Sequence, residues 1–263
     1  MRRTVLRWSA VAGCVVVLAV LAFIVFGPDP SAPAAVAEAP TTTRPAPTTT
    51  TTTEPELPPV PVAATVADAK GSTVDLFSEP DVVDAERPTM DNPTHEGLPV
   101  VFLVLEEKGP WLRVQVSMRP NERVAWVKRS QVVVRTVPNR IVVRLAERRL
   151  VVYEGTEGDD ELLSETVAIG SSRTPTPTGR FFVDGWVPLD GTGPYGAGQL
   201  SVAGFSDVLQ SFGGGVGQIA IHGTNSPGLL GQAVSNGCVR MQNDALLRLI
   251  ELAPLGTPVE IVP

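Results

Sequence analysis

The chain has few cysteines, few histidines and few aromatic residues, and these shortages exclude several classes of protein. Two cysteines, Cys14 and Cys238, cannot build a disulfide framework, so stability has to come from packing. The two histidines, His95 and His222, form no Cys/His cluster of the metal-binding kind, and we expect neither a metal ion nor a cofactor. Basic residues number 21 against 28 acidic ones, which argues against a nucleic acid as partner.

Arginines at positions 2, 3 and 7 precede an uncharged run over residues 8–26. These nineteen residues would span about 28 Å as a helix, close to the bilayer hydrocarbon thickness of about 30 Å. We predict an uncleaved signal anchor over residues 1–27, single-pass in the cell membrane, with the rest of the chain outside. The alternatives are a lipoprotein box at residues 11–14 and a cleavable signal that ends near residues 35–37. An anchor would embed Cys14 in the membrane, out of reach of Cys238.

Residues 28–62 are dominated by Pro, Thr and Ala, with almost no large apolar residue. Such a segment cannot bury a core and should stay extended. At about 3.1 Å per residue it reaches at most about 110 Å, which predicts a tether. The remaining residues, 63–263, are long enough for one or two cores.

Residues 63–137 predict a small all-β domain. Apolar runs separated by Gly, Pro and Asn turns favour strands over residues 100–105, 112–116, 124–127 and 132–134. The first of these runs is continuous and predicts a fully buried strand. The patterns at residues 109–114 and 125–127 resemble bacterial SH3-like domains. We expect Trp111 and Trp126 to anchor the core rather than to stack on a ligand.

Residues 138–263 predict a second, mostly β domain with one helix. A hairpin is expected over residues 141–153, and a short strand over residues 219–221 should present His222 at its end. Residues 184–217 hold ten glycines and little regular pattern, so we expect a flap over a groove. The predicted helix starts at a capping Asn243 or Asp244 and runs through residue 253, before a last strand over residues 257–262.

Cys238 lies sixteen residues after His222. A thiol with an imidazole close upstream is the minimal pair for cysteine acyl transfer. The plainer alternative is a buried, inert cysteine and a histidine that is hydrogen-bonded locally. The pair alone leaves both alternatives open.

Four segments of residues 138–263 make the chemical alternative the stronger one. They are Thr174-Pro175-Thr176-Pro177-Thr178-Gly179-Arg180-Phe181, Ile221-His222-Gly223-Thr224, Ser235-Asn236-Gly237-Cys238-Val239-Arg240-Met241, and Gly256-Thr257-Pro258-Val259-Glu260-Ile261. In this combination the region resembles the L,D-transpeptidase catalytic domain of the YkuD type. The order of anchor, linker, SH3-like domain and this domain is similar to actinobacterial members.

The resemblance implies a reaction on peptidoglycan. Cys238 would attack the carbonyl of the third residue of a tetrapeptide stem and release D-alanine. The thioester would then pass to the diaminopimelate amine of another stem, in the cell wall. His222 would act as the base and the Gly223 carbonyl would fix its tautomer. The N–H groups of Gly237 and Cys238 are candidate oxyanion donors.

The resemblance also implies substrate contacts and an inhibitor. Thr224, Ser235, Asn236 and Arg240 are candidates for substrate binding. Arg240 would hold the Cys238 loop in place or face a substrate carboxylate, and we favour the loop role. Family thiols are acylated by carbapenems, so Cys238 should form such an adduct.

One residue departs from the family pattern. Many members have Ser-His-Gly-Cys, whereas this chain has Asn236 at the place of that histidine. The predicted base, His222, is intact, so we expect activity to survive. Two other functions stay open: an L,D-carboxypeptidase that uses the same site, and a non-catalytic protein that binds the cell wall.

Overall fold

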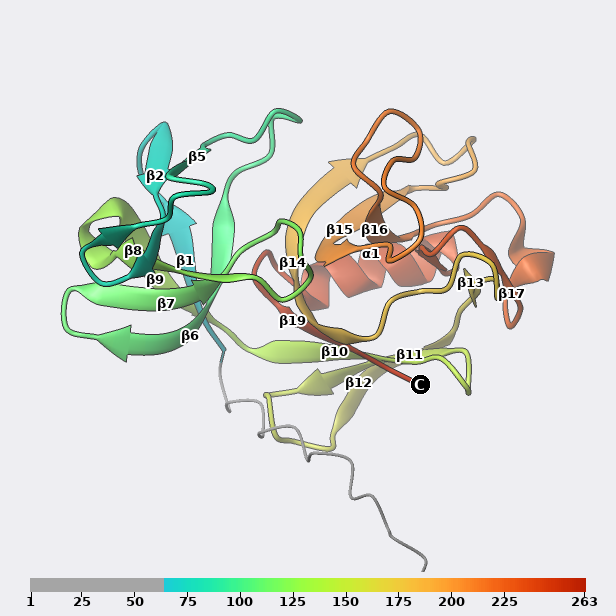
Figure 1. Cartoon of the computed structure of the whole chain (residues 1–263). Coiled ribbons are helices and arrows are strands. Elements are labelled where there is room, and N and C mark those ends of the chain that lie inside the picture. Colours follow the sequence, from blue (N-terminus) through green and yellow to red (C-terminus); the bar gives the residue numbers. More distant parts are fainter. Residues whose placement is uncertain (1–63) are drawn as a thin grey trace, which may run out of the picture. The chain divides into compact units, whose positions relative to one another are not determined.

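Two β sheets joined through Pro138 make up the part of the chain that the computed structural model describes, residues 64–263 (Figure 1). Both sheets belong to one compact unit. The predicted anchor over residues 1–27 and the predicted linker over residues 28–62 lie outside the described residues, as does Cys14. Within residues 64–263, no helix is long and apolar enough to span a membrane.

The first sheet has seven strands in the order β4-β3-β8-β7-β6-β1-β9. They are β1 (Ala64–Ala69), β3 (Phe77–Glu79), β4 (Val82–Val83), β6 (Val101–Lys108), β7 (Trp111–Gln115), β8 (Val124–Lys128) and β9 (Val132–Val137). A separate antiparallel pair consists of β2 (Thr73–Asp75) and β5 (Thr89–Asp91), and a short 3-10 helix covers Arg129–Gln131. The neighbouring pairs β6–β7 and β7–β8 are antiparallel, as short turns of Gly, Pro and Asn allow.

The strands predicted in this region are confirmed, with one error in burial. Only Val101 and Phe102 of β6 are buried, and Leu105 is 47% exposed, because the strand continues into charged residues at the sheet surface. Trp111 is buried and packs edge-on against Phe77, whereas Trp126 is half-buried. The resemblance to SH3-like domains stays a prediction, as does the predicted domain boundary at residue 137.

The second sheet has eight strands in the order β12-β11-β10-β19-β14-β15-β16-β18. They are β10 (Asn139–Arg144), β11 (Arg149–Glu154), β12 (Glu161–Thr166), β14 (Gly179–Pro188), β15 (Gly198–Phe205), β16 (Gln218–His222), β18 (Val239–Arg240) and β19 (Pro258–Val262). The short strands β13 (Ile169–Gly170) and β17 (Ala233–Ser235) pair with each other, and a second 3-10 helix covers Pro227–Leu229. The predicted hairpin, the strand before His222 and the last strand are confirmed.

The single α-helix of the described residues, α1 (Asn243–Leu252), packs on this sheet (Figure 1). Its Leu246 and Leu249 are fully buried in one core with Ile219 and Ile221 of β16. The predicted helix is therefore confirmed, but the predicted cap is wrong. Gln242 occupies the cap position without a side-chain hydrogen bond, and Asn243 bonds elsewhere.

The prediction of an irregular flap over residues 184–217 is wrong. The second half of β14 and all of β15 fall inside these bounds, and the irregular parts are residues 189–197 and 206–217. Glycines stand inside these strands because neighbours pack directly on the backbone. A Cβ on Gly204 would meet the Phe181 ring at 3.0 Å, for example. A high glycine content therefore marks close packing here rather than the lack of a strand.

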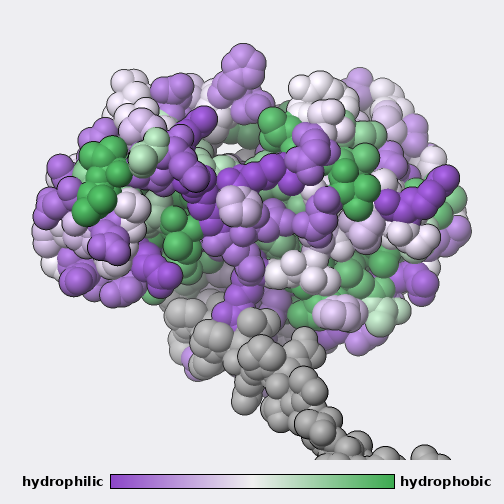
Figure 2. All heavy atoms as spheres, viewed as in Figure 1, coloured by the Kyte–Doolittle hydropathy of each residue, from purple (hydrophilic) through white to green (hydrophobic). Residues whose placement is uncertain are grey.

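Side chains of the loop between β7 and β8 bond to the backbone at the end of β15 and in the segment that follows it. Arg119 donates to the carbonyl oxygens of Ser206, Leu209 and Val216, at 2.9–3.2 Å. Asn121 pairs with both the N–H and the carbonyl of residue 205, at 2.8 Å each. On the face that Figure 2 draws, the middle of the surface is mainly hydrophilic, and the hydrophobic residues lie in separate groups on either side.

Candidate active site

The parallel pairing of β16 with β18 brings the predicted base and nucleophile together. His222 is the register partner of Arg240, so their side chains lie on one face of the sheet. Ala220, two residues before His222, shares that face. Cys238 directly precedes β18, and its thiol forms a hydrogen bond with the Ala220 backbone. The face with Ile219 and Ile221 packs on α1 instead.

His222 is held in one tautomer by its own turn. The side chain is buried, and Nδ1 lies 2.6 Å from the Gly223 carbonyl oxygen, so Nδ1 carries the proton and donates it. Nε2 then has its lone pair available to accept a proton. The pKa of His222 is lowered to about 4, mainly by burial; the bond to Gly223 opposes this shift and the charge of Arg240 adds to it. The imidazole is therefore neutral at neutral pH.

Cys238 is half-buried and forms no disulfide. Burial raises the pKa of the thiol, and the hydrogen bond with Ala220 and the charge of Arg240 offset this in part. The resting pair is therefore a neutral thiol with a neutral imidazole, rather than a thiolate with an imidazolium. Such a pair transfers its proton when the sulfur attacks.

Ser235 shapes the loop that carries the thiol. Its buried hydroxyl donates to the Cys238 carbonyl at 2.6 Å and accepts from the Gly237 N–H at 3.1 Å. Gly237 has φ +116°, which L side chains rarely adopt, so a glycine is needed for this turn. Because the Gly237 N–H is bonded inside the loop, the Cys238 N–H, which bonds to no described residue, is the better candidate for the oxyanion donor.

The Thr-Pro-Thr-Pro segment and the residues before it bond to the same loop. The Thr174 hydroxyl and the Ser171 N–H both donate to the Ser235 carbonyl, at 3.1 and 2.9 Å. The buried Thr176 hydroxyl accepts from the Gly170 N–H at 2.9 Å. These contacts give the segment a structural role, since they fix the strand end from which Cys238 is presented.

Asn243 holds the turn after His222. Its Oδ1 accepts from the N–H groups of Thr224 and Ala197, at 3.0 and 3.1 Å. A Cβ on Gly223 would meet this oxygen at 2.2 Å, so the glycine makes room for the clamp. The sequence drew attention to Asn243 only as a helix cap. Tyr195, which the sequence did not single out, lies in the clamped segment with its ring centroid 4.8 Å from that of His222.

The predicted substrate-binding residues fall into two groups. The side chains of Thr224 and Ser235 are buried and hydrogen-bonded within their own turns, so they fix the backbone conformation of these turns. Asn236 is exposed beside the thiol, and Arg240 is half-buried. The Nε of Arg240 is buried and hydrogen-bonds to no described residue. Both expected roles of Arg240, holding the Cys238 loop in place and facing a substrate carboxylate, stay predictions.

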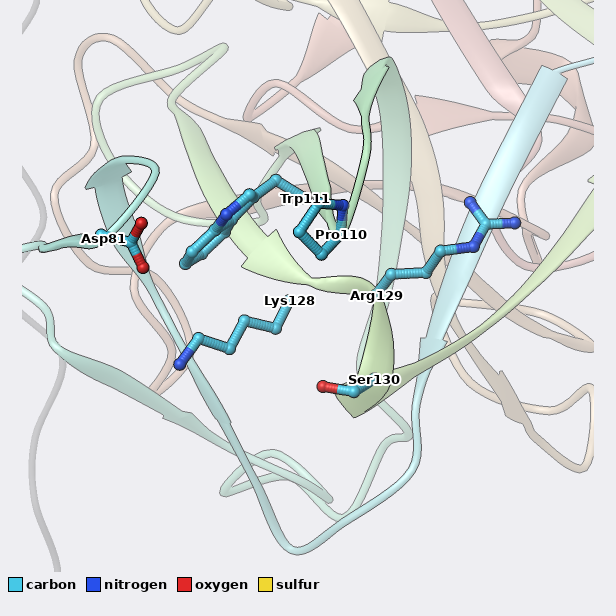
Figure 3. Close-up of a pocket in the computed structure, with 6 residues that line it drawn as sticks. All are labelled: Asp81, Pro110, Trp111, Lys128, Arg129 and Ser130. Atoms are coloured by element: carbon cyan, nitrogen blue, oxygen red, sulfur yellow. The ribbon is translucent and has the colours of Figure 1, made fainter.

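A hollow on the first sheet, of about 550 Å³, is lined by residues of three segments (Figure 3). The Lys128 ammonium lies 5.6 Å from the centre of the Trp111 ring. The hollow contains neither thiol nor imidazole among its lining residues, so it is not the reaction site. Among residues 64–263, no group of three or more His, Cys, Asp and Glu side chains could hold a metal ion.

Comparison with known proteins supports the motifs. Residues 138–261 match the family YkuD, described as an L,D-transpeptidase catalytic domain. A Bacillus licheniformis protein named as the L,D-transpeptidase YkuD is 40% identical over 128 residues, which cover 49% of this chain and 68% of the relative. Its Bacillus subtilis namesake is 34% identical over 126 residues, which cover 48% and 67%. An L,D-transpeptidase structure from Mycobacterium smegmatis aligns with a TM-score of 0.40 and 13% identity, over 63% of this chain and 92% of that one, a score too low to add to the assignment.

Proposed function

Since the chain belongs to the YkuD family of L,D-transpeptidases, we propose that it transfers acyl groups between peptidoglycan stems through Cys238. One observation carries this proposal. A buried His222, fixed in one tautomer by a 2.6 Å bond to the Gly223 carbonyl, shares a parallel strand pair with the cysteine segment. No carboxylate is needed to orient the imidazole, because the backbone carbonyl does so.

In the first step Cys238 attacks the carbonyl carbon of the third residue of a donor tetrapeptide. The S–C bond forms as His222 Nε2 takes the thiol proton, and the oxyanion faces the Cys238 N–H. The C–N bond to the terminal D-alanine then breaks, and the imidazolium returns the proton to the leaving amine. The products are a thioester and free D-alanine.

In the second step the side-chain amine of an acceptor diaminopimelate attacks the thioester. His222 accepts a proton from that amine and returns it to sulfur as the C–S bond breaks. The new amide crosslinks the two stems. Water as the acceptor would give a tripeptide instead, which is the L,D-carboxypeptidase outcome.

Arg240 supports the substrate assignment. Its guanidinium lies on the same face as His222 and acts electrostatically on both the imidazole and the thiol. Its buried Nε has no acceptor among the described residues. The donor's terminal carboxylate is an acceptor of the right charge, so Arg240 would hold the leaving D-alanine.

The test is to incubate the full-length chain with a disaccharide-tetrapeptide and to follow the masses of protein and products. The expected result is an acyl-enzyme on Cys238, release of D-alanine and a crosslinked dimer. A tripeptide without dimer would establish the hydrolase. No adduct and no turnover by the folded protein would refute the catalytic proposal and favour a wall-binding protein. A carbapenem should likewise add its mass to Cys238.

The uncharged run over residues 8–26 supports a place at the membrane. We propose that it anchors the chain in a single pass, with residues 64–263 on the cell-wall side and residues 28–62 as the tether. Extraction of the full-length chain with detergent but not with salt would test the anchor, and release by salt alone would refute it.

A further inference from the structure

A cleft of about 770 Å³ lies between the two sheets, a volume within the usual range for ligand sites. Strands β14, β15 and β16 line one side, and residues 86–101 and 117–119 of the first region line the other. Ala220 lines this cleft and is also the residue whose backbone bonds the Cys238 thiol. Cys238 does not line the cleft itself, but the cleft reaches a residue that the thiol contacts.

A carboxylate stands in this cleft on a β-bulge. The pairing of β14 with β15 shifts register between Val183 and Gly185, which leaves Asp184 as the extra residue. Asp184 Oδ2 accepts hydrogen bonds from the Ser117 hydroxyl of the first sheet and from Gln218 Nε2, the latter at 2.7 Å. Oδ1 is buried and accepts no hydrogen bond from another described residue, and the one further bond to this carboxyl comes from its own backbone N–H. A buried polar atom of this kind calls for a partner.

Three arginines line the cleft with Asp184. Two of them, Arg119 and Arg123, bond to other groups, whereas Arg87 forms no ion pair among the described residues. Arg119 donates to three backbone carbonyls, and Arg123 pairs with Asp84 and Glu86. None of the ion pairs among the described residues includes Asp184. The partner that the site lacks is therefore a positive hydrogen-bond donor, such as an ammonium group.

The distance along β16 decides which ammonium group this can be. Gln218, which bonds Asp184, lies two residues before Ala220, whose backbone bonds the Cys238 thiol, or about 7 Å along an extended strand. The attacking amine of the acceptor has to lie at the thioester carbon on Cys238, so it cannot also lie at Asp184. The donor stem has an amine that does not react, at the end of the long side chain of its third residue. That residue has its carbonyl at Cys238, so its side chain can extend along the cleft.

Resting on the function proposed above, we propose that Asp184 binds the side-chain ammonium of the donor's third residue and so selects donors that carry an amine there. The state of the carboxyl agrees with a missing cation. The pKa of Asp184 is raised to about 6, mainly by burial and also by the charge of Glu96, while the hydrogen bonds from Ser117, from Gln218 and from its own backbone oppose the shift. An ammonium ion at Oδ1 would supply the positive charge that the carboxylate lacks.

The first test needs no variant. Stoichiometric full-length enzyme is mixed with the tetrapeptide donor, or with the same donor acetylated on its diaminopimelate amine, and first-turnover release of D-alanine is followed. We expect at least a tenfold lower kcat/KM for the acetylated donor, mainly through KM. Equal values for the two donors would overturn the role of Asp184 but leave the proposed function standing. No acyl-enzyme from either donor would instead refute the proposed function, on which this inference rests.

The second test assigns the preference to Asp184. The Asp184→Asn variant keeps the shape of the side chain, so it should use the two donors with kcat/KM values within about twofold. Asp159→Asn is the matched control, because it removes the same charge from an exposed turn between β11 and β12. It should keep the full preference of the wild type. A preference unchanged in Asp184→Asn would overturn the assignment, and if that variant does not fold, Asp184→Glu, which keeps the charge, must keep part of the preference.

Discussion

The two sheets have nearly the same number of strands, yet they bury polar side chains very differently. Of ten buried polar side chains, two belong to the first region, Asp84 and Gln115, and eight to the second. Asp84 pairs with Arg123, and Gln115 reaches across to the Arg180 carbonyl at 2.7 Å. The second region instead buries His222 at the end of β16, Thr224 just after it and Ser235 at the end of β17. Buried polar groups are costly unless they are bonded, so their concentration marks where the fold is built for chemistry.

The largest test of this contrast is to remove the nucleophile. Cys238→Ala should lower acyl transfer by at least about 10⁴-fold, because no other described side chain replaces the thiol. The half-buried position should leave the fold intact, which circular dichroism and the unfolding midpoint would check. The carbapenem adduct should be absent by mass. Crosslinking at the wild-type rate would contradict the assignment of the second sheet as the reaction site.

The next test loosens the turn without touching the reacting groups. Asn243→Ala removes the acceptor of the Thr224 and Ala197 N–H groups, so the His222 turn should lose its position. We expect kcat to fall about 10–100-fold and the free energy of unfolding to fall by about 1–3 kcal/mol. The control is Asp244→Asn, one residue along α1. Unchanged kcat in Asn243→Ala would show that the clamp has no part in catalysis.

Much of the fold could be predicted from the sequence because apolar periodicity is local. The strand before His222, the hairpin over residues 141–153 and the buried face of α1 all follow from alternation or helical spacing. Strands β14 and β15 were missed because glycine has no periodic signal. Their stability comes from neighbours such as Phe181 that pack on the bare backbone, and those neighbours are distant in sequence.

The sequence predicts which residues form the candidate site, but not the hydrogen bonds that hold them in place. The spacing of His222 and Cys238 and the surrounding motifs identified the pair, and the register of β16 and β18 explains why they meet. The clamp by Asn243 and the bulge at Asp184 depend on pairings between distant segments, which no local pattern reports. Asn243 at a helix start predicts a cap, and only the fold shows that its oxygen is used elsewhere.

A third prediction concerns the contact between the two sheets. Arg119→Ala removes the hydrogen-bond donors of three carbonyls within residues 206–216. The free energy of unfolding of the full-length chain should therefore fall by about 2 kcal/mol. Urea denaturation would measure this against Arg173→Ala, which removes an exposed arginine. If the free energy of unfolding falls by the same small amount in both variants, the contacts of Arg119 do not stabilise the packing of the two sheets.

A fourth prediction concerns how kcat depends on pH below neutrality. With the pKa of His222 lowered to about 4, the imidazole stays about nine-tenths neutral at pH 5, whereas an ordinary histidine would be mostly protonated. The kcat of acylation at saturating donor should therefore change less than about twofold between pH 7 and pH 5. KM should rise over this range, because Asp184 gains a proton as the pH falls through about 6. A kcat that falls more than tenfold by pH 5 would contradict a neutral, desolvated base.

The smallest expected effect comes from the surface of the first sheet. Arg129 and Glu107 form an ion pair at 2.6 Å, but both side chains are nearly half exposed, at 47% and 48%. Solvent and salt screen such a pair, so Arg129→Gln should change the free energy of unfolding by less than about 0.5 kcal/mol. Urea denaturation at low and high salt would check this. A loss above about 1 kcal/mol would mean that exposed charges of the first sheet stabilise the fold as much as its buried polar contacts do. A loss near zero would show that exposed charge pairs contribute little to stability. The difference between the two regions would then lie in their buried polar groups, which have no water to bond and rely on each other for hydrogen bonds.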